Sequence, residues 1–102
     1  MFTDGIRVDD TPTNISTSTA LNFASLGASN RFYLVNKSEH RLWLIGQTSE
    51  TAPDADAEAT LNERFCLEPW EKVLFSNNIN TNLFAYYPKG QSGIVSYMYG
   101  PK

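Results

Sequence analysis

Short stretches of apolar residues, separated by polar turns, recur along the chain about every ten residues. The clearest is 31–47, RFYLVNKSEHRLWLIGQ, where two apolar arms flank the polar residues 36–40. Both arms are rich in β-branched and aromatic side chains, and the residues between them are typical of turns. The stretch therefore predicts a β-hairpin. Because both faces of both arms are apolar, we expect it to lie centrally, covered on each side by other strands or by a partner protein.

Five further short strands are predicted outside this hairpin. The apolar residues of 19–26 fit a helix or a strand almost equally, but the polar runs on either side favour a strand. Pro69 divides 64–75 into two strands joined by a turn, because proline cannot donate to a strand ladder. The last two strands are predicted at 83–87 and 94–99.

About seven strands with regular turn signals predict an all-β fold: a single small β-sandwich or barrel of antiparallel strands over residues 19–102. A chain of 102 residues makes one domain and can bury enough surface for one core. Trp43, inside the hairpin, is most simply a core residue. We also expect core side chains from the alternating strand positions Phe32, Leu34, Leu42, Leu44, Val73, Phe75, Leu83 and Ile94.

Residues 1–18 are predicted to form an extended, flexible N-terminal arm. They are dominated by Thr, Asp, Asn and Ser, and their isolated apolar residues are too sparse to bury against the domain alone. Two interpretations are open: a frayed terminus, or an arm that becomes ordered on a neighbouring subunit. In the second, Phe2, Ile6 and Val8 would enter separate pockets of that neighbour.

Residues 48–62 form a polar, alanine-rich loop, of a length that is usually functional or mobile in a compact domain. Within it, 55–61 is compatible with one or two helical turns. Asp54, Asp56 and Glu58 have the alternate spacing of a calcium loop, but its glycine and its final glutamate are missing. We therefore expect a solvated acidic loop, no metal ligand and no cofactor.

Composition excludes several classes of function. The net charge is −3, with both signs spread through the chain, so no basic stripe predicts a nucleic-acid partner. No apolar run approaches the roughly 20 residues of a membrane span, and no signal peptide begins the chain, so we expect synthesis in the cytosol and no membrane partner. The 2 Trp, 5 Tyr and 6 Phe are many for so small a core. Some should lie on the surface, as at protein or sugar interfaces.

No arrangement of residues predicts catalysis. The only histidine, His40, lies in the predicted hairpin turn, and the only cysteine, Cys66, lies in a predicted strand, where it is expected to be a small apolar side chain. Glu63, Glu68 and Glu71 could approach one another as in a glycosidase, but acids beside a turn are usually solvated. We expect no catalytic residue and no enzyme activity.

The aromatic residues offer the best candidates for contact with a partner. Trp70 follows the turn proline and is interpreted either as an interface anchor or as a lid over the edge of the core. Tyr86 and Tyr87 end a predicted strand and are expected to be exposed. With the arm, the candidate interface residues are Phe2, Ile6, Val8, Trp70, Tyr86 and Tyr87.

Several short motifs follow one another in a familiar order: a strand with an Asn-x-Ser turn, Leu42-Trp43-Leu44-Ile45-Gly46, a variable loop, Leu67-x-Pro69-x-Glu71, a strand ending in Phe75, Leu83-x-Ala85, and Ile94-Val95-Ser96-Tyr97-Met98. This order, over residues 19–99, resembles the small β-sandwich accessory proteins of tailed-phage virions, which decorate or cement capsids or join structural parts of the particle. In that pattern a glycine commonly follows the turn proline. Here Trp70 stands instead, which favours a contact at this place.

The resemblance implies a non-enzymatic virion protein, made in the host cytoplasm. It would bind the capsid or neighbouring structural subunits and stabilise the particle, as a homo-oligomer in the assembly. The alternative, from a different class, is a carbohydrate-binding β-sandwich, lectin-like or fibre-associated. Such a protein would use Trp70, Tyr86 and Tyr87 as stacking platforms.

Overall fold

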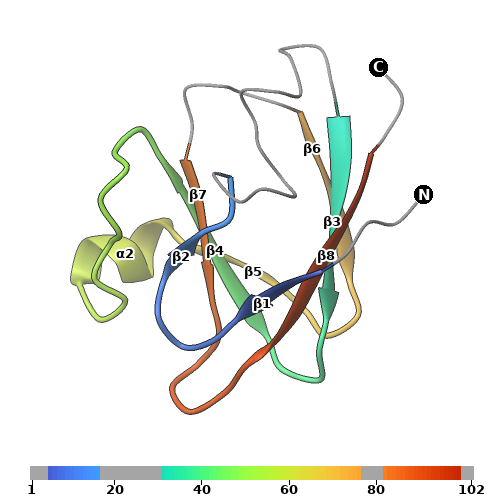
Figure 1. The fold of residues 1–102 in the computed structure, drawn as a ribbon. Coiled ribbons are helices and arrows are strands. Elements are labelled where there is room, and N and C mark those ends of the chain that lie inside the picture. The colour runs from blue at the N-terminus through green and yellow to red at the C-terminus, as the bar shows by residue number, and fades with distance from the viewer. Residues whose placement is uncertain (1–4, 17–30, 77–81, 100–102) are drawn as a thin grey trace.

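The computed structural model describes residues 5–16, 31–76 and 82–99, which form a sandwich of two β-sheets (Figure 1). Every strand pair within the two sheets is antiparallel. The predicted all-β sandwich is therefore confirmed. The elements of the described residues are β1 (Ile6–Val8), β2 (Thr13–Asn14), β3 (Arg31–Lys37), β4 (Leu42–Gln47), α2 (Glu58–Glu63), β5 (Phe65–Leu67), β6 (Lys72–Ser76), β7 (Asn82–Tyr86) and β8 (Gly93–Tyr99).

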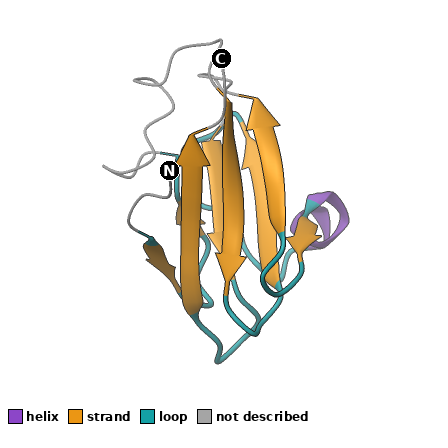
Figure 2. Cartoon of the chain, turned by 90° about the vertical axis from the view of Figure 1, so that its right-hand side faces the viewer, coloured by secondary structure: helices purple, strands orange, loops and turns teal. Residues whose placement is uncertain are grey.

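The strand order gives the sandwich its topology. The first sheet has the order β1-β8-β3-β6. In Figure 2 the outer face of this sheet is turned toward the viewer. The second sheet has the order β2-β7-β4-β5. Most consecutive strands thus lie in opposite sheets, and the first two strands pair with the last two. This is the arrangement of an eight-stranded jelly roll, a double-sheet fold found in viral capsid domains and lectins among others.

The predicted hairpin is wrong, because β3 and β4 do not pair with each other. β3 lies in the first sheet between β8 and β6, and β4 lies in the second sheet between β7 and β5. Residues 38–41 cross from one sheet to the other. Each strand nevertheless lies between two neighbours within its own sheet. The expected cover on both faces is not found for β3, whose outward-facing Lys37 is exposed. Local pattern does not distinguish the two connections, since a polar segment of this length suits either a hairpin or a crossover between sheets.

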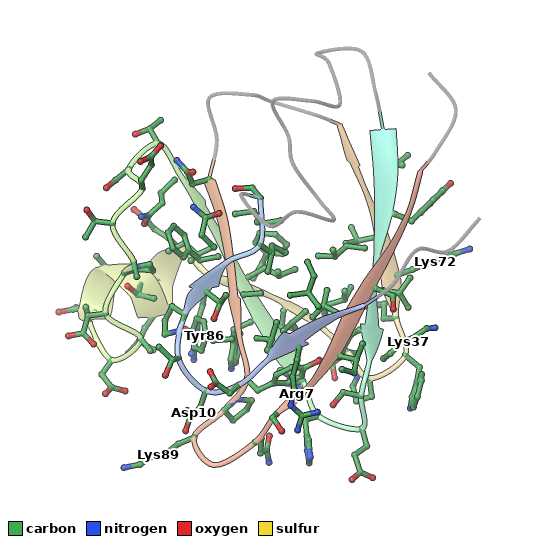
Figure 3. All side chains as sticks on the ribbon, in the orientation of Figure 1. Arg7, Asp10, Lys37, Lys72, Tyr86 and Lys89 are labelled. Atoms are coloured by element: carbon green, nitrogen blue, oxygen red, sulfur yellow. The ribbon has the colours of Figure 1, made fainter. Side chains whose placement is uncertain are left out.

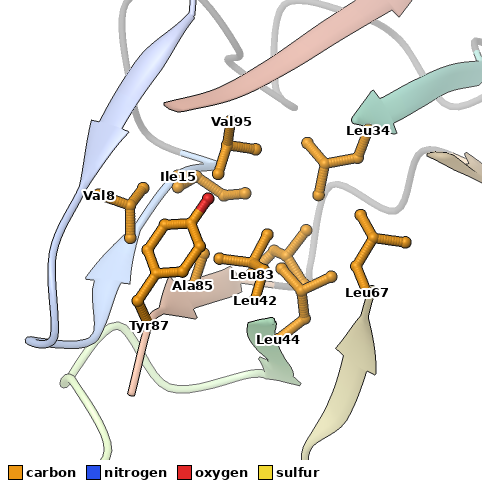
Figure 4. Close-up of a cluster of buried hydrophobic side chains, with 10 residues drawn as sticks. All are labelled: Val8, Ile15, Leu34, Leu42, Leu44, Leu67, Leu83, Ala85, Tyr87 and Val95. Atoms are coloured by element: carbon orange, nitrogen blue, oxygen red, sulfur yellow. The ribbon is translucent and has the colours of Figure 1, made fainter. Parts of the chain in front are cut away.

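The core lies between the two sheets and receives side chains from both (Figure 4). Of the predicted core residues, Leu34, Leu42, Leu44 and Leu83 are buried there, and Val73 packs against them. The side chains of the predicted Phe32 and Phe75 are outside the described part. The buried cluster consists of Val8, Ile15, Leu34, Leu42, Leu44, Leu67, Leu83, Ala85, Tyr87 and Val95.

Ile94 and Trp43 were expected in the core, but both face outward. Side chains alternate along a strand, so Ile94 points away because its neighbour Val95 points inward. Both alternating sets of β8 contain apolar residues, which left its inner face ambiguous in the sequence. Trp43 lies between Leu42 and Leu44, which are both in the core.

Residues 5–16 belong to the sandwich, so the predicted N-terminal arm is wrong for this part. In β1, Ile6 is aligned with Val95 of β8, and in β2, Thr13 is aligned with Ala85 of β7. Val8 and Ile15 are in the core. The apolar residues are sparse, but they suffice because they fall on the inner side. Residues 1–4 and the predicted strand 19–26 are outside the described residues.

A helical segment lies beyond the second sheet, on the side away from the first (Figure 1). The helical turns predicted at 55–61 are found at α2 (Glu58–Glu63). The outward-facing residues of the second sheet include Ile45, Phe84 and Tyr86, and all three are buried although they do not belong to the core cluster. The second sheet therefore has apolar packing on both of its faces.

Candidate functional site

Trp70 is 66% exposed and occupies a tight turn between β5 and β6, residues 68–71, which we call the Trp70 turn. The Glu71 amide donates to the Glu68 carbonyl at 3.0 Å, and the backbone φ of Trp70 is 62°. A proline at the second position and a left-handed third residue are features of a type II turn, whose third position favours glycine. A left-handed tryptophan costs on the order of 1 kcal/mol or more.

The Trp70 turn is fixed to the end of β3 by backbone hydrogen bonds. The Trp70 amide donates to the Asn36 carbonyl at 2.8 Å, and the Asn36 amide donates to the Glu71 carbonyl at 3.0 Å. On the outside of the turn, Arg41 Nε lies 2.9 Å from Glu68 Oε1. The turn thus has a defined conformation even though its central side chain is in solvent.

The Asn36 side chain is completely buried and joins several loops beneath the Trp70 turn. Its Nδ2 donates to the carbonyls of His40 at 2.8 Å, Leu67 at 3.0 Å and Glu68 at 3.2 Å. Its Oδ1 accepts from the Tyr87 hydroxyl at 2.7 Å. One amide therefore joins the ends of β3, β5 and β7. Sequence analysis placed Asn36 in a turn and missed this role.

Tyr87 completes this buried network. Burial disfavours its phenolate and raises the pKa of its hydroxyl, and a hydrogen bond with the Ser38 side chain acts in the opposite direction. Gly93 allows the close approach, because a Cβ there would lie 2.6 Å from Ser38 Cβ and 2.7 Å from the Tyr87 hydroxyl. The network is thus closely packed as well as hydrogen-bonded.

The candidate interface residues differ in their exposure to solvent. Trp70 is exposed, as predicted. Tyr86 and Tyr87 are 3% and 0% exposed, so their predicted exposure is wrong. The reason is that β7 lies centrally in the second sheet, where one face meets the core and the other meets the helical segment.

Two residues of the predicted arm, Ile6 and Val8, pack inside the domain, where contact with a neighbouring subunit was expected. Val8 is buried in the core and Ile6 packs against it, so neither is available for a pocket on a neighbour. Their alternation around Arg7 was the sequence signal for a strand, but three residues are too few to distinguish it from chance. Phe2 lies outside the described residues.

A hollow of about 530 Å³ lies beside Trp43 and Tyr86, between the second sheet and the helical segment. The Arg64 guanidinium stacks on the Trp43 ring, 3.5 Å from its centroid, and Arg64 Nη1 donates to the Tyr86 hydroxyl at 3.1 Å. Asp56 and Lys89 are among the other lining residues. Because Arg64 covers one face of the Trp43 indole, a sugar ring cannot stack on that face.

Three of the carboxylates considered for metal binding or catalysis, those of Asp54, Glu68 and Glu71, have local partners. Asp54 Oδ1 accepts from the Asp56 amide at 3.0 Å, and Glu71 Oε1 accepts from the Glu68 amide at 3.0 Å. Cys66 is exposed instead of packed as a small apolar residue, with Sγ 3.5 Å from Glu68 Oε1. Among the described residues, no three His, Cys, Asp or Glu side chains lie close enough to share a metal ion. No described helix has the length and apolar character to cross a membrane.

Comparisons of the chain with models of protein families, with curated proteins and with solved structures found no match.

Proposed function

We propose that this protein is a non-enzymatic structural protein of a tailed-phage virion, of the capsid cement or decoration type. It binds the capsid or neighbouring structural subunits and stabilises the particle. The observation that carries the proposal is Trp70, an exposed tryptophan held in a left-handed conformation by a buried hydrogen-bond network. Exposed aromatic anchors often dominate the binding energy of protein interfaces.

The backbone of the Trp70 turn supports a role in binding. Glycine would satisfy the turn without strain, and tryptophan at this position adds strain and exposes apolar surface. Neither effect stabilises the isolated domain. Both are explained if the indole is buried by a partner, and the rigid turn then lowers the entropy lost on binding.

The surroundings of the Trp70 turn extend the candidate contact. β5 and β6, which flank the turn, are each an edge strand of their sheet. β5 carries the exposed aromatic side chain Phe65. A hollow of about 170 Å³ between the two strands is lined in part by Leu67 and Val73. A partner that covers Trp70 and this edge buries two exposed aromatic side chains, Trp70 and Phe65.

Protein binding and carbohydrate binding are distinguished by the exposure of the aromatic residues and not by the fold. A jelly roll is compatible with capsid-associated proteins and with lectins, so the fold alone does not decide between them. The carbohydrate-binding alternative relied on three stacking platforms, and two of these, Tyr86 and Tyr87, are buried. Protein binding through Trp70 is therefore the better supported proposal.

The test compares attachment of variants to assembled phage capsids by co-sedimentation. Trp70→Gly removes the indole and also relieves the left-handed strain, so the domain should remain folded with an equal or higher melting temperature. Attachment should weaken by about 30-fold, the effect of losing a hot-spot residue worth about 2 kcal/mol. Thr11→Ala, at an exposed position between β1 and β2, is the control and should change attachment less than about twofold.

Two results would overturn the proposal. One is a Trp70→Gly variant that attaches to capsids as tightly as the unmodified protein. The other is binding to a glycan array, abolished by the same substitution, together with no attachment to capsids. The second result would establish the carbohydrate-binding alternative.

A further inference from the structure

The outer face of the first sheet carries positive charge and no acid at its described strand positions. Inward-facing Val8, Leu34, Val73 and Val95 fix which residues alternate to the outside. Among the outward positions whose side chains the structure describes, three are cationic, and all three are exposed. These described outward residues, of which Val35 and Ser96 are buried, are Arg7, Tyr33, Val35, Lys37, Lys72, Leu74, Ile94 and Ser96. We call this surface the cationic face.

Strand register gathers the cations on the cationic face. Arg7 and Lys37 are both aligned with Ile94, so they lie in one row across three strands. Lys72 is aligned with Val35 in the adjacent row. Its ammonium lies 5.2 Å from the centroid of the Tyr33 ring. Figure 3 shows Lys37 and Lys72 pointing away from the sandwich.

The opposite side of the molecule carries the complementary charge. Residues 48–63, which we call the acidic segment, contain five acids and no lysine or arginine. All five acids are exposed: Glu50, Asp54, Asp56, Glu58 and Glu63. The neighbouring Arg64 carries one positive charge and therefore offsets only one of these five negative charges.

We propose that the cationic face of one copy of this protein docks on the acidic segment of a second copy. The two surfaces lie on opposite sides of the sandwich, so they cannot meet within one chain (Figure 1). Each surface also has an exposed apolar side chain, Leu74 on the cationic face and Leu61 on α2. Charge complementarity and these two leucines together fit a protein contact between copies.

The contact is heterologous, because two different surfaces of the same chain meet. Such contacts repeat from copy to copy and form a closed ring or an open chain. The occupant is a second copy and not nucleic acid, since the three cations are interspersed with Tyr33 and Leu74 and the whole chain carries a net charge of −3. This self-association does not depend on attachment to a capsid, so the two proposals can fail separately.

The first experiment measures the mass of the purified full chain by light scattering across a range of salt concentrations. Raising the ionic strength from about 0.01 M to about 1 M shortens the Debye length from about 30 Å to about 3 Å. The apparent dissociation constant between copies should rise at least about tenfold over this range, because salt screens exposed charges. A protein that is monomeric at low salt and high concentration overturns the proposal, as does an oligomer that salt does not weaken.

The second experiment exchanges the charges of the two surfaces. Arg7→Glu, Lys37→Glu and Lys72→Glu together change the three cations of the cationic face from +3 to −3. Glu50→Lys, Asp56→Lys and Glu58→Lys together change the acidic segment from −5 to +1. Each triple variant alone should be monomeric, because its two surfaces then carry like charge.

An equimolar mixture of the two triple variants should associate again, because each altered surface then meets an altered partner of opposite charge. Lys89→Glu makes the same change of charge beside Asp56, on the acidic side of the molecule, so it should leave association unchanged or strengthen it. Circular dichroism verifies that each variant is folded. If a variant is unfolded, the salt series of the unmodified protein tests the proposal on its own. A mixture of folded variants that remains monomeric overturns the proposal.

Discussion

Asn36 is the residue on which the Trp70 turn most depends. Its side chain donates to three carbonyls and accepts from Tyr87, all inside the protein. A buried polar group that loses its partner costs about 1 to 3 kcal/mol. Because one amide serves so many partners, a substitution at Asn36 leaves several buried groups unsatisfied at once.

We expect Asn36→Ala to lower the free energy of unfolding by about 3 kcal/mol, as measured by urea denaturation. Asn62→Ala, at an exposed position of α2, is the control and should stay within about 0.5 kcal/mol. An Asn36→Ala variant as stable as this control would show that the network contributes nothing to the fold.

Because of Tyr87, the free energy of unfolding should depend on pH in the alkaline range. Its pKa is raised in the folded protein, so its contribution is complete below the ordinary tyrosine pKa of about 10 and is lost as the pH rises through the folded value. The free energy of unfolding should therefore fall above about pH 10, by at most about 1.4 kcal/mol per pH unit. Tyr87→Phe should lose this dependence. The dependence is not due to Tyr87 if the variant and the unmodified protein show equal slopes.

At the level of elements, the first two strands connect the N-terminal residues to both sheets. β1 pairs with β8 and β2 pairs with β7, and the residue after β2, Ile15, is completely buried. The Ile15 amide also donates to the Leu83 carbonyl at 2.9 Å. This segment is therefore part of the fold and does not act as a separate arm.

Ile15→Ala should lower the free energy of unfolding by about 2 to 5 kcal/mol, the usual cost of removing a large buried aliphatic side chain. Arg7→Ala, at an exposed position of β1, should change it by less than about 0.5 kcal/mol. Chemical denaturation of both variants checks this. Equal stabilities would place Ile15 outside the core and restore the interpretation of this segment as an arm.

The positions of the strands were predicted from the sequence more successfully than the pairing between them. Period-two alternation and turn residues are local, so strands near 31–37, 42–47, 83–87 and 94–99 could be found directly. Pairing is not local. The alternation of β3 and β4 suits a hairpin and a crossover equally, and only contacts with strands far along the chain decide between them.

The candidate site was predictable only in part, for the same reason. Trp70 was recognised because a tryptophan in place of a turn glycine is a local anomaly. The hydrogen bonds of Asn36 to Leu67 and Tyr87 span 31 and 51 residues, and no local pattern reports them. Tyr86 and Tyr87 were misjudged because their burial depends on the central position of β7 in its sheet.

At the scale of the whole molecule, surfaces with different properties lie at different places. The Trp70 turn and the edge strand β5 present exposed aromatic side chains, the outer face of the first sheet presents cations, and residues 48–63 present acids. A small domain can thus contact a large particle through one surface and its own copies through others. This division suits a protein whose role is to join subunits.

The most direct test of the account is the environment of Trp70 before and after attachment. Trp43→Phe keeps an aromatic ring beside Arg64 and leaves Trp70 as the only tryptophan. In the free protein its fluorescence should be red-shifted and readily quenched by acrylamide, because the indole is exposed. On addition of assembled capsids, the account predicts a blue shift and protection from quenching. Capsid binding that leaves the emission and quenching of Trp70 unchanged would contradict it.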